Sequence, residues 1–130
     1  MTTDLWMLVA TALLALFLPF VYSTYRVLRP GGMAWSLGNR ELPIEISPWT
    51  ARAFRAHQNM VENIGPFAVI VLVAHVAGKA NELTALGSVI YFWSRVAHAS
   101  LYIAGIKFLR TMAFGVGLAG EFLIFLQLCR

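Results

Sequence analysis

The sequence predicts an all-α integral membrane protein, a four-helix bundle that forms a single domain over residues 1–130. Hydrophobic residues make up 59% of the chain and charged residues only 12%, which is far from the balance of a soluble domain. The hydrophobic residues are also grouped into segments of about 20 residues, the length that crosses a bilayer as a helix. No segment alternates with period two, so the pattern excludes a transmembrane barrel.

The four transmembrane helices are expected at about residues 5–28, 48–76, 83–107 and 111–128. The first is uncharged from Leu5 to Tyr25 and is too long for the core of a signal peptide, so we expect it to be retained. The second should begin with Ser47 as its N-cap, because proline, here Pro48, fits the first helical position. The stretch from 29 to 47 is rich in glycine and proline, which predicts an ordered loop that caps one end of the bundle.

Positive residues are concentrated on one side of the predicted bundle. The two loops that share this side carry or adjoin Arg26, Arg29, Arg40, Arg52, Arg55, Lys107 and Arg110. The other side has only Lys79 and Arg130. Because positive loops remain in the cytoplasm, we expect the arginine-rich loops to be cytoplasmic and both termini to lie outside. The same rule accounts for the net charge of +4 without a nucleic-acid partner.

Two of the predicted helices each carry one polar stripe. At about 100° per residue, one face of the second helix groups Arg52, Arg55, Asn59 and Glu62. One face of the third groups Tyr91, Arg95, His98 and Tyr102. Counting inward from the predicted ends of this antiparallel pair matches Glu62 with Arg95, Asn59 with His98, and Arg55 with Tyr102. His57 points away from its stripe, and its place near a helix end requires no special role.

These stripes have two interpretations. Ionised groups inside a bilayer cost about 2.5 to 3.5 kcal/mol each, so they should be paired or hydrated. One possibility is a structural ladder of salt bridges that joins the helices. The other is a water-accessible pocket that offers arginines to an anionic ligand, which the excess of cations over anions favours. The sequence shows no metal-ligand spacing, phosphate-binding glycine loop or serine nucleophile motif, and its single cysteine, Cys129, excludes a disulfide within the chain.

Glu121 is a separate case, because it lies in the fourth predicted helix among Gly115, Gly117 and Gly120. Small residues allow helices to approach closely in a membrane. We therefore interpret this segment as a tight helix contact, with the carboxyl group either paired with Arg95 or protonated.

Two stretches of the sequence resemble the MAPEG family, the membrane-associated proteins of eicosanoid and glutathione metabolism. They are RAFRAHQNMVENIGPF at residues 52–67 and SRVAHASLYIAGIKFLRT at residues 94–111. The resemblance extends to the four-helix layout and implies a homotrimer, with glutathione as co-substrate bound between neighbouring subunits near the cytoplasmic side. It also implies a lipophilic small-molecule substrate that arrives from the membrane lipids, and a bacterial-type member in the inner membrane.

The resemblance also implies roles for individual residues. It assigns the binding of glutathione to Arg55, Asn59, Glu62, Arg95, His98, Tyr102 and Thr111, and to Arg26 of a neighbouring subunit. Arg110 corresponds to the catalytic arginine near the thiol, where a guanidinium group favours thiolate over thiol. Arginines suit the two carboxylates of glutathione, and Glu62 could bind its amine. The family pattern is broken at Gln58 and Phe114, where some members have arginine and tyrosine, so a related thiol remains an alternative.

The function expected from these observations is a glutathione-dependent membrane transferase or peroxidase that acts on lipophilic electrophiles. The alternatives are a small proton- or cation-coupled transporter that uses Glu62 or Glu121, and a non-catalytic membrane scaffold. A transporter should carry its ionisable site near the midplane with access from both sides. The cations here are concentrated at one mouth of the bundle, which favours the enzyme.

Overall fold

The computed structural model describes residues 1–41 and 43–130 and contains only helices and their connections within them. The helices are α1 (Thr3–Val27), α2 (Gly32–Leu37), α3 (Pro48–Val76), α4 (Glu82–Ala104) and α5 (Lys107–Leu128). Their number differs from the predicted four, because α2 is a short helix of 6 residues inside the stretch expected to be a loop. Gly31, with φ +75°, precedes α2, and Gly38 follows it. The short helix therefore has a glycine at each end and no proline inside it.

Three helices, α1, α3 and α5, are long and apolar enough to cross a membrane. The fourth long helix, α4, has 23 residues but is not among these three. Its buried face carries Ser88, Ser94, Arg95 and His98, and such polar side chains lower its mean hydropathy. The chain is therefore an all-helical membrane protein with three candidate membrane-spanning helices and a fourth long helix whose buried face is polar.

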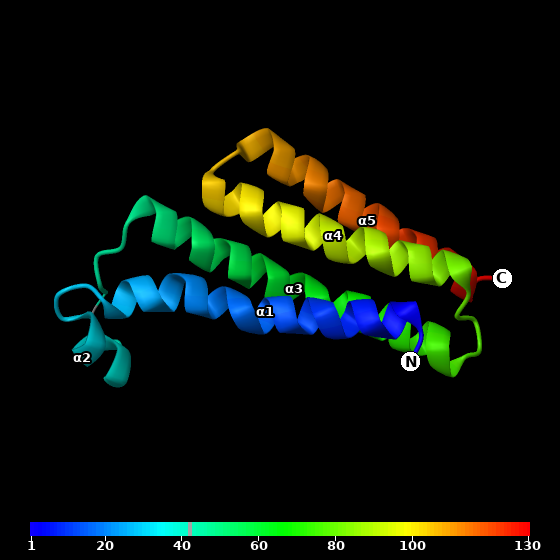
Figure 1. The fold of residues 1–130 in the computed structure, drawn as a ribbon, viewed down its shortest axis with the longest axis horizontal. Helices are drawn as coiled ribbons and strands as arrows, with labels where there is room; N and C mark the ends of the chain where they lie inside the picture. The colour runs from blue at the N-terminus through cyan, green and yellow to red at the C-terminus, as the bar shows by residue number, and fades with distance from the viewer. Residues whose placement is uncertain (42) are drawn as a thin grey trace.

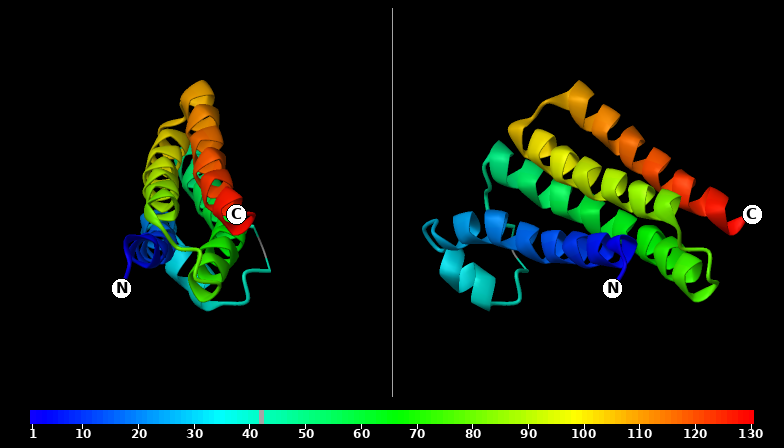
Figure 2. Two further views of the ribbon diagram at one scale, coloured as in Figure 1. Left: turned by 90° about the vertical axis from the view of Figure 1, so that its right-hand side faces the viewer. Right: turned by 45° about the vertical axis from the view of Figure 1, so that its right-hand side comes forward.

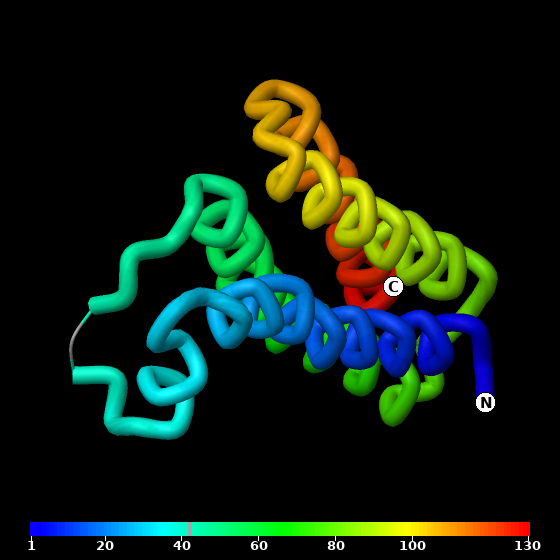
Figure 3. The backbone as a smooth tube through the Cα atoms, turned by 60° about the vertical axis from the view of Figure 1, so that its left-hand side comes forward, coloured from blue at the N-terminus to red at the C-terminus, as the bar shows by residue number. Residues whose placement is uncertain are grey.

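The long helices form two helical hairpins, α1 with α3 and α4 with α5 (Figure 1). Both chain termini lie at one end of the molecule, and the α1–α3 connection and the α4–α5 turn lie at the other. We call the latter the arginine end, because Arg26, Arg52 and Arg110 lie close to it in the chain. The two hairpins diverge toward the arginine end in the views of Figures 1 and 2, and α2 lies beside that end of α1 (Figure 3).

The helix ends agree with the predictions at α3 and differ from them at the α4–α5 turn. Ser47 caps α3 as expected, since its Oγ accepts a hydrogen bond from the amide of Thr50 at 3.2 Å. By contrast, α4 ends at Ala104 instead of about residue 107, and α5 begins at Lys107 instead of about residue 111. Gly105, with φ +84°, terminates α4 in the left-handed conformation that glycine adopts most readily.

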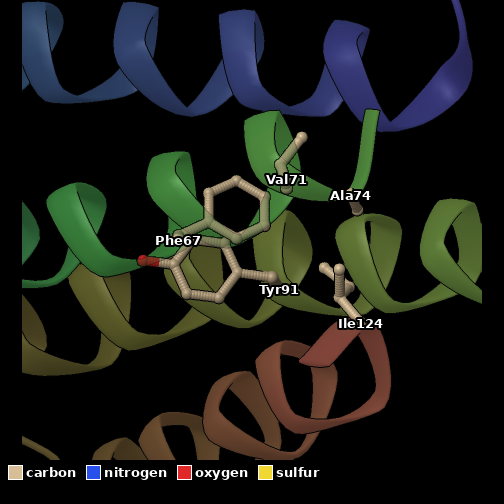
Figure 4. Close-up of a cluster of buried hydrophobic side chains, with 5 residues drawn as sticks. All are labelled: Phe67, Val71, Ala74, Tyr91 and Ile124. Carbon is tan, nitrogen blue, oxygen red and sulfur yellow. The ribbon is translucent and has the colours of Figure 1, made fainter. Parts of the chain in front are cut away.

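The core lies where α3, α4 and α5 meet (Figure 4), and it is built from the buried side chains of Phe67, Val71, Ala74, Tyr91 and Ile124. The rings of Phe67 and Tyr91 are stacked with centroids 3.8 Å apart. The hydroxyl of Tyr91 donates to the carbonyl of Asn63 at 2.9 Å, so one side chain contributes both an apolar and a polar contact to the α3–α4 interface.

Helices α4 and α5 approach closely at glycines. A Cβ on Gly120 would lie 2.7 Å from the carbonyl oxygen of Gly87, and a Cβ on Gly117 would lie 2.8 Å from Nη2 of Arg95. The predicted glycine contact is therefore confirmed for Gly117 and Gly120. It is wrong for Gly115, where a Cβ would meet nothing within 4 Å.

Candidate functional site

The candidate site is centred on Arg95 of α4, which is 0% exposed and lies against α3 and α5. Its Nη1 donates to Oδ1 of Asn59 on α3 at 3.2 Å. Its guanidinium carbon lies 5.1 Å from the ring centroid of Tyr91 and 4.9 Å from that of Phe114. Within the described chain, the Nε and Nη2 atoms of Arg95 have no hydrogen-bond partner. A buried guanidinium group with free donors is well suited to bind an anion.

The contact between Arg95 and Asn59 corrects the predicted matching of the polar stripes. The prediction placed Glu62 opposite Arg95 and Asn59 opposite His98, whereas Asn59 is the partner of Arg95. The observed partner therefore lies three residues before the predicted one on α3. This shift equals the distance between the predicted end of α4, about residue 107, and its observed end at Ala104. The same shift places Arg52, instead of Arg55, at the level of Tyr102. Nε of Arg52 donates to the carbonyl of the adjacent Ile103 at 2.9 Å.

A row of three rings with a guanidinium group at each end follows the α4–α5 interface from Arg95 toward the arginine end. The ring of His98, which is 6% exposed, lies 6.0 Å from that of Phe114 and 5.6 Å from that of Tyr102. The guanidinium carbon of Arg110 lies 4.2 Å from the ring centroid of Tyr102. We call Arg95, Phe114, His98, Tyr102 and Arg110 the cation–aromatic row. Attraction between guanidinium groups and ring faces helps to fix these side chains.

The structure therefore brings together five of the residues singled out in the sequence, namely Asn59, Arg95, His98, Tyr102 and Arg110. Arg55, Glu62 and Thr111 are instead exposed on the single chain. The hydroxyl of Thr111 donates to the carbonyl of Lys107 at 3.2 Å, which is a bond within its own helix.

Arg26 lies in a different cluster, between α1 and α3. Its guanidinium carbon is 4.8 Å from the ring centroids of both Tyr22 and Phe54. The hydroxyl of Tyr22 forms a hydrogen bond with Nδ1 of His57 at 3.0 Å. Sequence reasoning missed this role of His57, although a histidine within a largely apolar helix generally requires a polar partner.

A groove of about 300 Å³ opens beside the Arg26 cluster. It is lined by Tyr22, Phe54, His57, Gln58, Val61 and Glu62. Glu62, which was predicted to face Arg95, thus lies on the α1 side of α3 together with its neighbour Gln58. The candidate residues consequently occupy two faces of α3, one toward α4 and one toward α1.

The fold and these contacts define an α-helical membrane protein with a buried arginine inside its bundle and further cationic and aromatic side chains between that arginine and the arginine end. The chain belongs to the MAPEG family, whose model matches residues 5–129. This family includes glutathione-dependent transferases and peroxidases as well as non-catalytic members. The match covers nearly all of the four long helices and confirms the resemblance seen in the sequence. No curated protein matches the chain.

Proposed function

We propose that this protein is a glutathione-dependent membrane transferase or peroxidase that acts on lipophilic electrophiles. The observation that supports this best is the cation–aromatic row. It begins at the buried Arg95, two of whose nitrogens have no partner among the described residues, and ends at Arg110. A self-sufficient lattice of salt bridges would pair those nitrogens with protein carboxylates. Free donors instead favour an anionic ligand that arrives from outside the chain.

Glutathione carries two carboxylates, one ammonium group and one thiol, and the candidate residues match these groups. Arg55 and Arg95 suit the carboxylates, since guanidinium groups bind carboxylates with two parallel hydrogen bonds. Glu62 suits the ammonium group, while Asn59, His98, Tyr102 and Thr111 offer neutral polar contacts. Arg26, contributed by a neighbouring subunit, would add a further cation to the same ligand.

Arg110 is the proposed catalytic residue. A guanidinium group beside the sulfur stabilises the thiolate relative to the thiol, so the nucleophile forms without a separate general base. In the transferase reaction, the sulfur forms a bond with the electrophilic carbon of the acceptor, and the leaving group departs with the electron pair of the broken bond. A lipophilic acceptor would reach this sulfur from the bilayer.

The proposal includes the arrangement of the protein in the membrane. We propose that α4 crosses the bilayer together with α1, α3 and α5. Its 23 residues correspond to a helix of about 35 Å, which exceeds the hydrocarbon thickness of about 30 Å. The arginine end would then be cytoplasmic and both termini outside, with the bacterial inner membrane as the location.

A homotrimer would complete the site. Arg55 and Glu62 are exposed on the single chain, which supports a ligand that is enclosed only when a second subunit covers α3. We propose that glutathione binds at this interface between neighbouring subunits. Chemical crosslinking of the purified protein in detergent tests the oligomer, and a ladder that ends at the trimer is the expected result.

Calorimetric titration of glutathione into the purified protein tests the proposed function. Wild type should give saturable heat, and both Arg55→Ala and Glu62→Ala should weaken the binding at least tenfold. Lys79→Ala is the matched control, because Lys79 is an exposed cation at the opposite end of the bundle. An absence of heat with wild type contradicts the proposal and favours a transporter or a scaffold. Unchanged binding in both variants contradicts the site assignment.

A further inference from the structure

Helix α5 carries a buried carboxyl group that the proposed reaction does not use. Glu121 is 9% exposed, and its Oε1 atom has no hydrogen-bond partner among residues 1–41 and 43–130. An unpartnered polar atom in apolar surroundings costs free energy unless a donor reaches it. Glu121 therefore requires a donor that the described side chains do not supply.

An apolar groove of about 550 Å³ lies beside Glu121 between α3 and α5. It is lined by Ile70, Leu118, Ala119, Glu121, Phe122 and Phe125. Glu121 is the only ionisable residue in this lining. Pockets for small organic molecules commonly have volumes of about 300 to 1,000 Å³ and few polar groups, so the groove has the size and composition of such a pocket.

Glu121 lies at the boundary between this groove and the interior of the molecule. At about 100° per residue, it is rotated about 40° from Gly117 on one side and about 40° from Phe125 on the other. A Cβ on Gly117 would lie 2.8 Å from Nη2 of Arg95, so that face is turned toward the guanidinium group, whereas Phe125 lines the groove. The nearby Arg95 donates to Asn59, and its remaining nitrogens, like Oε1 of Glu121, have no partner in the described part of the chain.

The groove is separate from the proposed catalytic arginine. Glu121 follows Arg110 by eleven residues on the same helix, which corresponds to about 16 Å along its axis. Phe122 and Phe125 are 59% and 45% exposed, so aromatic surface is available next to the carboxyl group. Aromatic rings and a carboxylate both attract a cation, and a groove wall of hydrocarbon attracts an apolar body.

We propose that this groove binds a lipophilic amine, with its ammonium group on the Glu121 carboxylate and its apolar part against Phe122 and Phe125. The ligand supplies the missing donor, and the carboxylate offsets the cost of an ammonium group inside the bilayer. Entry from the lipid requires no passage through the arginine end. This site is independent of glutathione binding and of the reaction proposed above.

Binding of radiolabelled decylamine to the full chain in phosphatidylcholine nanodiscs tests the proposal, with empty nanodiscs as the blank. Wild type should bind the amine saturably, and both Glu121→Gln and Ala119→Phe should weaken binding at least tenfold. The first variant removes the negative charge, and the second fills the groove while keeping the carboxylate. Decan-1-ol, which has the same chain without the cation, should not distinguish wild type from Glu121→Gln.

Two matched variants serve as controls. Glu82→Gln removes an exposed carboxylate at the start of α4, and Met112→Phe enlarges an exposed side chain of α5 outside the groove. Both should bind decylamine as wild type does. If Glu121→Gln unfolds in a thermal melt, Ala119→Phe still decides the question, because the side chain of Ala119 is exposed.

Three outcomes would overturn the proposal. Binding that does not saturate shows only partition into lipid, and equal binding by wild type and Ala119→Phe shows that the amine binds elsewhere. The third is that a second copy of the chain fills the groove. In that case wild type does not bind decylamine, and Ala119→Phe weakens the association of subunits measured by chemical crosslinking.

Discussion

Arg95 and Asn59 are joined across the α3–α4 interface by a hydrogen bond of 3.2 Å from Nη1 to Oδ1. The guanidinium group is buried, and its Nε and Nη2 atoms have no partner in the part of the chain that the structure describes. Asn59 therefore fixes the position of a charge whose remaining donors are free for a ligand. This arrangement links the stability of the bundle to the proposed binding of an anion.

Replacement of Asn59 by alanine should destabilise the protein by about 1–3 kcal/mol, because it removes an acceptor from a buried charged donor. Chemical denaturation in detergent, followed by tryptophan fluorescence, measures the change. Gln58→Ala is the control, since Gln58 is the exposed neighbour on the same helix and its change should stay within about 0.5 kcal/mol. Equal stability of Asn59→Ala and wild type would show that the bond to Arg95 contributes nothing.

Replacement of Gly120 by alanine should destabilise the α4–α5 contact by about 1–3 kcal/mol, because the new Cβ would lie 2.7 Å from the carbonyl oxygen of Gly87. Gly115→Ala is the matched control on the same helix. A Cβ there meets nothing within 4 Å, and alanine favours a helix over glycine by up to about 1 kcal/mol. The melting temperature should therefore fall in Gly120→Ala and rise in Gly115→Ala. A lower melting temperature in both variants would show that the close contact at Gly120 is not the cause.

Tyr22→Phe should lower stability by about 0.5–1.5 kcal/mol, because it removes the hydroxyl that bonds to Nδ1 of His57 at 3.0 Å. A double-mutant cycle with His57→Leu measures the interaction directly. Once His57 is replaced, the further change Tyr22→Phe should have little effect. Tyr25→Phe, one turn along at an exposed position, is the control, and strictly additive effects of Tyr22→Phe and His57→Leu would show that the two side chains do not interact.

Arg110→Met should reduce the rate of conjugation of glutathione to a chloronitrobenzene by about 100-fold, the scale of losing one group that stabilises developing charge. Ultraviolet absorbance of the bound thiolate should also fall in this variant at a glutathione concentration that calorimetry shows to be saturating, which separates loss of ionisation from loss of binding. Lys107→Met is the matched control, because Lys107 is an exposed cation in the first turn of α5. A variant that keeps the thiolate signal but loses activity would assign Arg110 a different role.

The helical class and the start of α3 could be predicted from the sequence, since hydropathy and the Ser47–Pro48 pair depend only on local chemistry. The register between the polar stripes could not. Counting from an end of the third predicted helix near residue 107 gives the wrong register, because Gly105 ends α4 at Ala104. The same error of three residues gives Arg95 the wrong partner on α3.

The contacts that α1 makes with α3 could not be predicted from the sequence either. Tyr22 and Arg26 are four residues apart and share one face of α1, but this spacing does not indicate that the face meets His57 and Phe54 of another helix. The short helix α2 was missed for a related reason, because its flanking glycines and prolines are typical of a loop. Interactions between helices depend on rotation and tilt, which hydropathy alone does not determine.

The contact between Gly87 and Gly120 couples the positions of α4 and α5. Four of the five residues that the structure brings together at the candidate site belong to α4 and α5, the pair that these glycines hold backbone to backbone. A change in the tilt between the two hairpins would therefore carry this set as a rigid body. The angle between the two hairpins can then change while the spacing of Arg95, His98, Tyr102 and Arg110 stays constant.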